Sequence, residues 1–96
     1  MSTLEKNRFS ILTKDLSRCY VCGLPKNHLH EIYFGNNRTN SMKYGCVVPL
    51  CYEHHEGNTG VHHNHTLDLR IKKECQKKFE EIYSTPFKDI FFKNYI

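Results

Sequence analysis

The 96-residue chain carries seven histidines and five cysteines, and both residue types bind metal ions and exchange protons near neutral pH. All seven histidines lie between His28 and His65, and four of the five cysteines lie inside or just before that window. The residues able to do chemistry are therefore concentrated in the middle of the chain, and we expect metal binding there.

Two pairs of residues have the spacing of zinc ligands: Cys19 with Cys22, and Cys51 with His54. Zinc takes four sulfur or nitrogen donors at the corners of a tetrahedron, and two such pairs close one site. Gly23 follows the first pair, where the backbone must turn sharply under the metal. The spacing predicts a structural Zn²⁺ ion bound by these four side chains. The alternative is free thiols beside a surface histidine.

Further histidines remain once His54 is assigned to zinc. His30 stands in a predicted strand, His55 in a predicted helical turn, and His62 and His63 follow in a loop. A strand with one histidine, a turn with an asparagine and a short helix with another histidine can hold one divalent cation and one general base over a scissile phosphate. The cation would stabilise the developing charge, and a neutral imidazole would take a proton from water.

The elements that must position these residues form one predicted α+β domain over residues 1–96. Its segments in chain order are an extended or irregular lead-in, the zinc and catalytic core, a helix and an aromatic tail: 1–17, 19–65, 67–83 and 84–96. Within the core, β-forming residues predict strands at 28–34 and 46–50, and residues 53–56 could form one helical turn. Residues 38–45 have no readable pattern.

The amphipathic helix at 67–83 is the clearest of these elements. Apolar residues recur at helical spacing, with Lys and Glu on the other face: Leu67, Ile71, Cys75, Phe79 and Ile82. Cys75 is therefore expected to be buried, as is Cys46 at the start of the second strand. The aromatic tail is expected to pack back onto the domain, because a free tail would expose an apolar patch.

The apolar content is low for a chain of this size. Only 26 residues are Val, Ile, Leu, Met or Phe, and the chain has no Ala and no Trp. A domain of about 100 residues buries about 60 to 65% of the surface of its unfolded chain, so a core this small needs a further stabilising element. A structural zinc ion could supply on the order of 10 kcal/mol.

The net charge of the chain and the cellular compartment that its cysteines indicate are less specific guides to function. Fourteen Lys and Arg against ten Asp and Glu give a formal charge of +4, which permits a polyanion such as DNA as partner without requiring one. No stretch approaches the roughly 18 consecutive apolar residues of a membrane span, and the start lacks the apolar run of a signal peptide. An odd number of cysteines fits a disulfide framework poorly. We therefore expect a cytoplasmic protein with reduced cysteines and no membrane partner.

Four strings of the sequence resemble the HNH, or ββα-metal, endonucleases of the zinc-stapled kind: CYVCG, LHEIYFG with NNR, KYGCVVPLCYEHH and GVHHN. More narrowly, residues 19–95 are similar to short bacteriophage HNH proteins, including those related to the RecA-dependent nuclease Ref. The resemblance implies a small ββα-metal domain that hydrolyses DNA phosphodiester bonds with metal-activated water, leaving a 5′-phosphate and a 3′-hydroxyl. It also implies Mg²⁺ or Mn²⁺ as the catalytic ion. A RecA-type filament is a candidate partner, and phage recombination or DNA processing in a bacterial or phage-infected cell is the candidate process.

The resemblance also implies roles for single residues. In the string LCYEHH, His54 would complete the zinc site and His55 would bind the catalytic ion. His62 is the candidate second ligand of that ion, and His30 is the candidate general base. The strand motif of the family is Asp-His or His-His, whereas His30 is followed here by Glu. The base could therefore also be His28 or this glutamate, with His30 then a metal ligand.

The asparagine and the phosphate contacts are expected close to the turn that follows the first predicted strand. The family's asparagine would fall at Cys46, so the orienting amide must come from elsewhere. Asn37 is the candidate, with Asn36 and Asn64 as alternatives. Arg38, next to this turn, and Lys43 are the candidate contacts to DNA phosphates.

Two other functions are compatible with the sequence. One is a zinc module that binds DNA or RNA without cleaving it, and the other is an adaptor that binds a protein through the aromatic tail. A pure binding module has no use for His30 and His55 beside a completed zinc site. The sequence does not indicate an oligomeric state or a DNA sequence preference.

Overall fold

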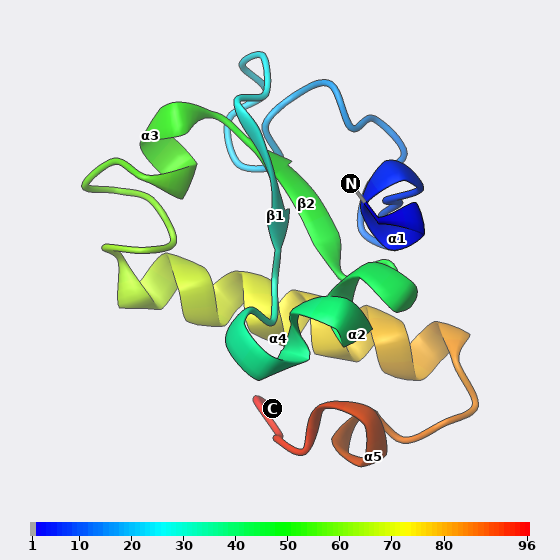
Figure 1. Ribbon diagram of the computed structural model, residues 1–96. Coiled ribbons are helices and arrows are strands. Elements are labelled where there is room, and N and C mark those ends of the chain that lie inside the picture. Colours follow the sequence, from blue (N-terminus) through cyan, green and yellow to red (C-terminus); the bar gives the residue numbers. More distant parts are fainter. Residues whose placement is uncertain (1) are drawn as a thin grey trace.

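The computed structural model describes residues 2–96, with a two-stranded antiparallel sheet at the centre (Figure 1). Strand β1 spans His28–Glu31 and strand β2 spans Val47–Leu50. In the register of the sheet, His30 lies opposite Val48 and Glu31 lies opposite Val47. Because successive side chains of a strand point to opposite faces, His30 and Glu31 serve different faces of the sheet.

Five α-helices and one 3₁₀ turn surround the sheet within residues 2–96. They are α1 (Thr3–Lys6), the 3₁₀ turn η1 (Gly35–Asn37), α2 (Arg38–Lys43), α3 (Tyr52–His55), α4 (His65–Ile82) and α5 (Phe87–Phe91). The prediction of a small α+β protein is confirmed. No helix in this part of the chain combines the length and the apolar character that crossing a membrane requires.

Helix α4 is the predicted amphipathic helix, and it lies beneath the two-stranded sheet in the view of Figure 1. It begins two residues before the predicted start, because the side chain of Asn64 accepts a hydrogen bond from the N–H of Leu67 (3.1 Å) and caps the first turn. Ile71, Cys75 and Phe79 are buried against the sheet side. The predicted burial of Cys75 is thus confirmed, and Cys46 is buried in the same cluster.

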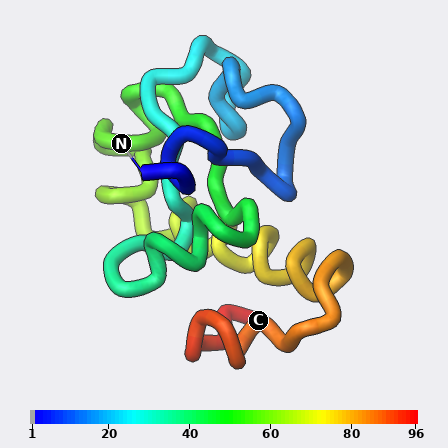
Figure 2. The backbone as a smooth tube through the Cα atoms, turned by 45° about the vertical axis from the view of Figure 1, so that its right-hand side comes forward, coloured from blue at the N-terminus to red at the C-terminus, as the bar shows by residue number. Residues whose placement is uncertain are grey.

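The aromatic tail folds back, as the sequence predicts. Helix α5 and the C-terminus lie at the end of the molecule away from α3 (Figure 2). Phe87 and Phe91 are fully buried there and stack with ring centroids 4.6 Å apart. Tyr33 packs on both rings, at 5.0 and 4.6 Å. Phe92 and Ile96 are the exceptions, since 78% and 63% of them are exposed. The tail therefore supplies much of the apolar core that the rest of the chain lacks.

Three helices were not predicted: α1, α2 and α5, the last of which lies in the aromatic tail. The lead-in was expected to be extended or irregular, but it begins with α1, in which Ser2 and Glu5 form a capping box. The unassigned segment after η1 forms α2, where the hydroxyl of Ser41 donates to the carbonyl of Tyr33 (2.7 Å) and accepts from its N–H (3.1 Å). These two buried hydrogen bonds connect α2 to the segment directly after β1. No apolar periodicity in the sequence predicts this helix.

Candidate functional site

The four predicted zinc ligands lie together. The ligand atoms of Cys19, Cys22, Cys51 and His54 all fall within 4.8 Å of one another. The Sγ atoms of Cys22 and Cys51 are 3.7 Å apart, and Nδ1 of His54 is 3.3 Å from Sγ of Cys51 and 3.7 Å from Sγ of Cys19. A tetrahedral zinc with Zn–S near 2.3 Å and Zn–N near 2.0 Å has edges of about 3.5 to 3.8 Å. The donors of this cysteine cluster are therefore spaced as one tetrahedral metal requires.

A tight turn carries the first two of these cysteines. The N–H of Gly23 donates to the carbonyl of Cys19 (2.9 Å), and Gly23 has a φ of +79° that glycine adopts without strain. Burial raises the pKa of the Cys19 thiol, but hydrogen bonds from the backbone of Cys51, Cys22 and Val21 outweigh it and lower this pKa to about 6. The backbone N–H groups of Cys51 and of the turn thus favour the thiolate, which is the form that binds metal.

A second cluster, the histidine cluster, consists of His30, His55 and His62. Its ligand atoms also lie within 4.8 Å of one another. Nε2 of His55 is 3.3 Å from Nε2 of His62, and the ring of His30 has its centroid 5.2 and 5.4 Å from those two rings. Two nitrogens bound at about 2.0 to 2.1 Å to one tetrahedral ion are about 3.3 to 3.4 Å apart. The three imidazoles could therefore hold a second metal ion.

Three elements bring the histidine cluster together. His30 comes from β1 and His55 from the end of α3, while His62 comes from the loop that follows. This loop folds back on α3, because the N–H of Val61 donates to the carbonyl of His54 (2.9 Å). A Cβ at Gly60 would lie 2.7 Å from the carbonyl carbon of His54, so only glycine fits this close approach.

Burial lowers the pKa of two histidines of this cluster, His30 and His55. It lowers the pKa of His30 to about 3, with further lowering from the neighbouring His55 and His62. Burial, followed by His28 and His62, also lowers the pKa of His55. Both rings are therefore neutral near pH 7 and keep a lone pair for a metal ion or a proton.

Two further residues, Glu56 and His28, contact the cluster, and the sequence interpretation missed the first of them. Oε1 of Glu56 lies 3.3 Å from Nδ1 of His55, and a carboxylate there favours the tautomer whose Nε2 lone pair faces the cluster. The ring of His28 stacks on that of His55, with centroids 4.4 Å apart and an angle of 17°. Glu56 directly follows the two histidines in the string CYEHHE, which was the only available signal.

The asparagines do not reach the histidine cluster in the expected way. The side chain of Asn37 donates to the carbonyl of Phe91 (3.1 Å), so it fastens the tail to the turn after β1. Asn64 caps α4, and Asn36 is exposed. The structure therefore assigns none of these amides to the orientation of a metal-bound group.

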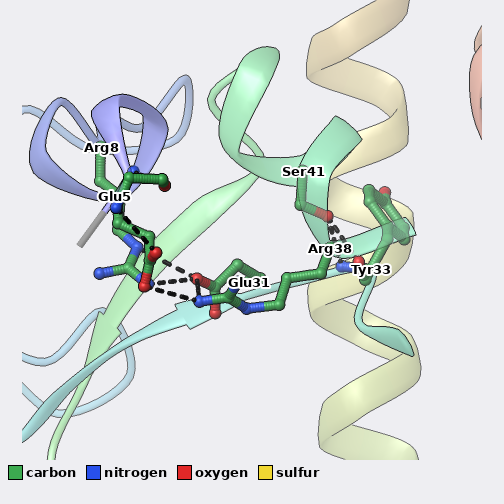
Figure 3. Close-up of polar contacts among 7 residues, drawn as sticks. Glu5, Arg8, Glu31, Tyr33, Arg38 and Ser41 are labelled. Atoms are coloured by element: carbon green, nitrogen blue, oxygen red, sulfur yellow. Dashed lines mark hydrogen bonds and ion pairs between the residues drawn. The ribbon is translucent and has the colours of Figure 1, made fainter. Parts of the chain in front are cut away.

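The other face of β1 carries a charged network, the Glu31 network (Figure 3). The buried carboxylate of Glu31 accepts two hydrogen bonds from Arg8, at 3.0 Å from Nε and 2.6 Å from Nη2. Arg38 lies 3.4 Å from the same carboxylate and 3.3 Å from Glu5. Glu31 is thereby paired with arginines rather than directed at the histidines. Arg38, the predicted phosphate contact, is shared between two carboxylates. Lys43 is exposed at the end of α2.

No known family profile, curated protein or solved structure matches this chain.

Proposed function

We propose that this protein is a zinc-stapled, metal-dependent endonuclease of the HNH type that hydrolyses phosphodiester bonds in DNA. One observation supports the proposal above the others. His54 and His55 are neighbours in one helical turn, yet they serve two different donor sets, a Cys₃His set and a set of three imidazoles. A protein that needed only a zinc staple would require the first set alone.

The cysteine cluster is the proposed structural zinc site. Three thiols and one imidazole are a typical donor set for structural zinc, and all four coordination positions are supplied by the protein. A site closed in this way leaves no position for water or substrate. Its role in the proposal is to join the Cys19 turn to the start of α3, which carries both His54 and His55.

The histidine cluster is the proposed reaction site. Three protein donors would leave at least one position of a metal ion open for water or a phosphate oxygen, and two donors would leave more. The cation would stabilise charge on the phosphate, and His55 and His62 are its proposed ligands. The donors are all nitrogens, which favours Mn²⁺ or a later transition ion over Mg²⁺. His30, neutral and beside both ligands, is the proposed general base.

The alternative assignment exchanges two roles. His30 would complete the metal site, and His28, stacked on His55 at the exposed edge, would take the proton. The two assignments differ in what a substitution removes. If His30 is the base, His30→Ala abolishes cleavage but retains the second metal ion, whereas a ligand role makes the variant lose both.

The test is nicking of supercoiled plasmid DNA with Mn²⁺ or Mg²⁺, with and without a RecA-type filament. Wild type is compared with His30→Ala, His55→Ala and His62→Ala, and with Tyr52→Ala as a control, since Tyr52 lies on the same helical turn as His55 and is exposed. We expect losses of at least about 100-fold for the three histidine variants and none for the control. Metal-dependent nicking that survives these histidine substitutions would contradict the proposed site.

The second candidate function is a zinc module that binds nucleic acid without cleaving it. It predicts DNA affinity that falls steeply with salt, no nicking by wild type under any of these conditions, and no effect of His55→Ala on binding. The gathering of three imidazoles around one point argues against it, because binding the DNA backbone requires positive charge, whereas burial lowers the pKa of His30 and of His55 and keeps both rings neutral.

A further inference from the structure

An exposed aromatic ring stands directly beside the histidine cluster. Phe34 follows β1, and 45% of it is exposed. Its ring centroid is 5.8 Å from that of His30 and 5.6 Å from that of His62. An apolar ring of this size is normally buried, and the core takes up its neighbours Ile32 and Tyr33 completely.

The ring is held in place by an ion pair. Nζ of Lys72 lies 4.4 Å from the ring centroid of Phe34 and 2.9 Å from Oδ2 of Asp68. Both charged side chains are largely buried, with 13% and 12% of them exposed. Lys72 is thus fixed by Asp68 and presents its charge to the ring. The contact with Lys72 therefore fixes the ring of Phe34 in its exposed position.

The ring also borders a surface pocket of about 360 Å³, whose lining includes His62, His63, His65 and Asp68. The pocket therefore combines an aromatic surface with polar groups that can donate and accept hydrogen bonds. Its carboxylate is already neutralised by Lys72, so the pocket offers little attraction to a phosphate. A flat heterocycle with polar edges matches this lining better than an anion or an aliphatic side chain does.

We propose that this pocket is a nucleobase subsite, in which Phe34 stacks on an unpaired base next to the phosphate held at the histidine cluster. The inference rests on the proposed nuclease function and adds the class of substrate. In a duplex both faces of a base are covered by its neighbours, so only single-stranded, frayed or flapped DNA presents a base that can stack on Phe34. Because every base has an aromatic face, the subsite selects strand state and not sequence.

The experiment measures binding and cleavage separately. Fluorescein-labelled oligonucleotides of one sequence, as single strand, duplex and Y-shaped flap, are titrated in Ca²⁺ and then cleaved in Mn²⁺. A second single strand carries 2-aminopurine, whose fluorescence is quenched when the base stacks. The variants are Phe34→Leu, which keeps apolar volume, and Phe34→Tyr, which keeps the aromatic face. Phe92→Leu is the matched control at an exposed phenylalanine in the tail.

We expect wild type to bind the single strand and the flap more tightly than the duplex and to quench 2-aminopurine. Phe34→Leu should weaken single-strand binding on the order of tenfold and abolish the quenching, while duplex binding stays unchanged. Phe34→Tyr should retain both properties, and Phe92→Leu should behave as wild type.

Two results would overturn the subsite: a wild type that prefers duplex DNA, or Phe34→Leu that binds and quenches as wild type does. Neither depends on cleavage. If no DNA is cut but single-strand binding and quenching depend on Phe34, the nuclease proposal fails and the base subsite stands. If duplex DNA is nicked and Phe34→Leu changes nothing, the nuclease stands and the subsite fails.

Discussion

The cysteine cluster and the histidine cluster share one helical turn through the adjacent residues His54 and His55, but they differ in their donors. The cysteine cluster has four donors, three of them sulfur, and it joins segments that are 29 residues apart at Cys22 and Cys51. The histidine cluster has three donors, all nitrogen, and one of them, His62, is exposed. A complete set of soft donors holds an ion permanently, whereas an incomplete set leaves room for exchange and reaction.

The two clusters also differ in what holds their side chains in position. The Cys19 turn and the start of α3 are joined through the cysteine cluster, and without a metal its thiols would repel one another once ionised. His30 and His55 are instead positioned by the sheet and by α3, and their rings are buried in the packed fold. We therefore expect the protein to depend on the first metal for folding and on the second only for reaction.

The largest expected effect is on folding. Cys51→Ser removes one thiolate of the cysteine cluster and should abolish tight zinc binding, which contributes on the order of 10 kcal/mol to folding in small zinc domains. The variant should lose its cooperative thermal transition in circular dichroism and bind less than one zinc per chain by elemental analysis.

The matched control for this substitution is Cys75→Ala. Cys75 is buried and lies outside both clusters, so its removal should cost about 1 kcal/mol through a small cavity and leave zinc bound. If Cys51→Ser binds no zinc but still folds and unfolds cooperatively, the cysteine cluster is not the structural zinc site on which folding depends.

The second effect separates the clusters by metal removal. Brief dialysis against a chelator such as EDTA should empty the histidine cluster and leave the zinc of the cysteine cluster in place, because the set of histidine donors is incomplete and partly exposed. Nicking should then fall by at least about 100-fold while the circular dichroism spectrum stays unchanged, and Mn²⁺ should restore activity. Loss of both metals in one step would mean that the two clusters are not independent.

Much of this comparison could be read from the sequence, because ligand spacing is a local property. Two residues separate Cys19 from Cys22, and two separate Cys51 from His54. This spacing predicts that these four side chains meet. The partnership of His30 with His55 and His62 depends on the register of β1 with β2 and on the loop over Gly60, which follow from tertiary contacts. The sequence interpretation therefore named these histidines as candidates, with His63 beside His62, but gave them individual roles only through the resemblance, and it did not reach Glu56.

Charged contacts between distant segments were the least predictable feature. Arg8 meets Glu31 across 23 residues, and neither residue type nor spacing indicates such a pairing. The same limit applies to Asn37, whose amide fastens the tail, and to Phe34. The exposure of the Phe34 ring beside the histidine cluster depends on the position of Lys72 in α4.

The third effect concerns the two faces of β1. Arg8→Ala would leave the carboxylate of Glu31 buried with only Arg38 nearby, so we expect a loss of about 2 kcal/mol in the free energy of unfolding. Arg38→Ala should cost less than about 1 kcal/mol, because Arg38 is 45% exposed and its ion pairs are longer. Urea titrations of both variants measure the difference. Equal losses would show that Arg8 does not dominate the Glu31 network.

The smallest effect is the contribution of His30 in the histidine cluster to the pH dependence of stability. Burial lowers the pKa of His30 from its ordinary value near 6.5 to about 3 in the folded protein. Between these values the unfolded chain binds a proton that the folded protein does not, so the free energy of unfolding must fall as the pH falls. The slope for one group is at most about 1.4 kcal/mol per pH unit.

His30→Asn removes this titration and should flatten the stability profile between pH 6.5 and 5, measured by urea unfolding without added divalent ions. The comparison must be a difference between variants, because protonation of the zinc ligands destabilises wild type and variant alike. His63→Asn is the control, since His63 is exposed in the loop and should leave the slope as in wild type. If His30→Asn keeps the full acid slope, the cysteine cluster carries the acid sensitivity, and the histidine cluster is not the buried, neutral site described here.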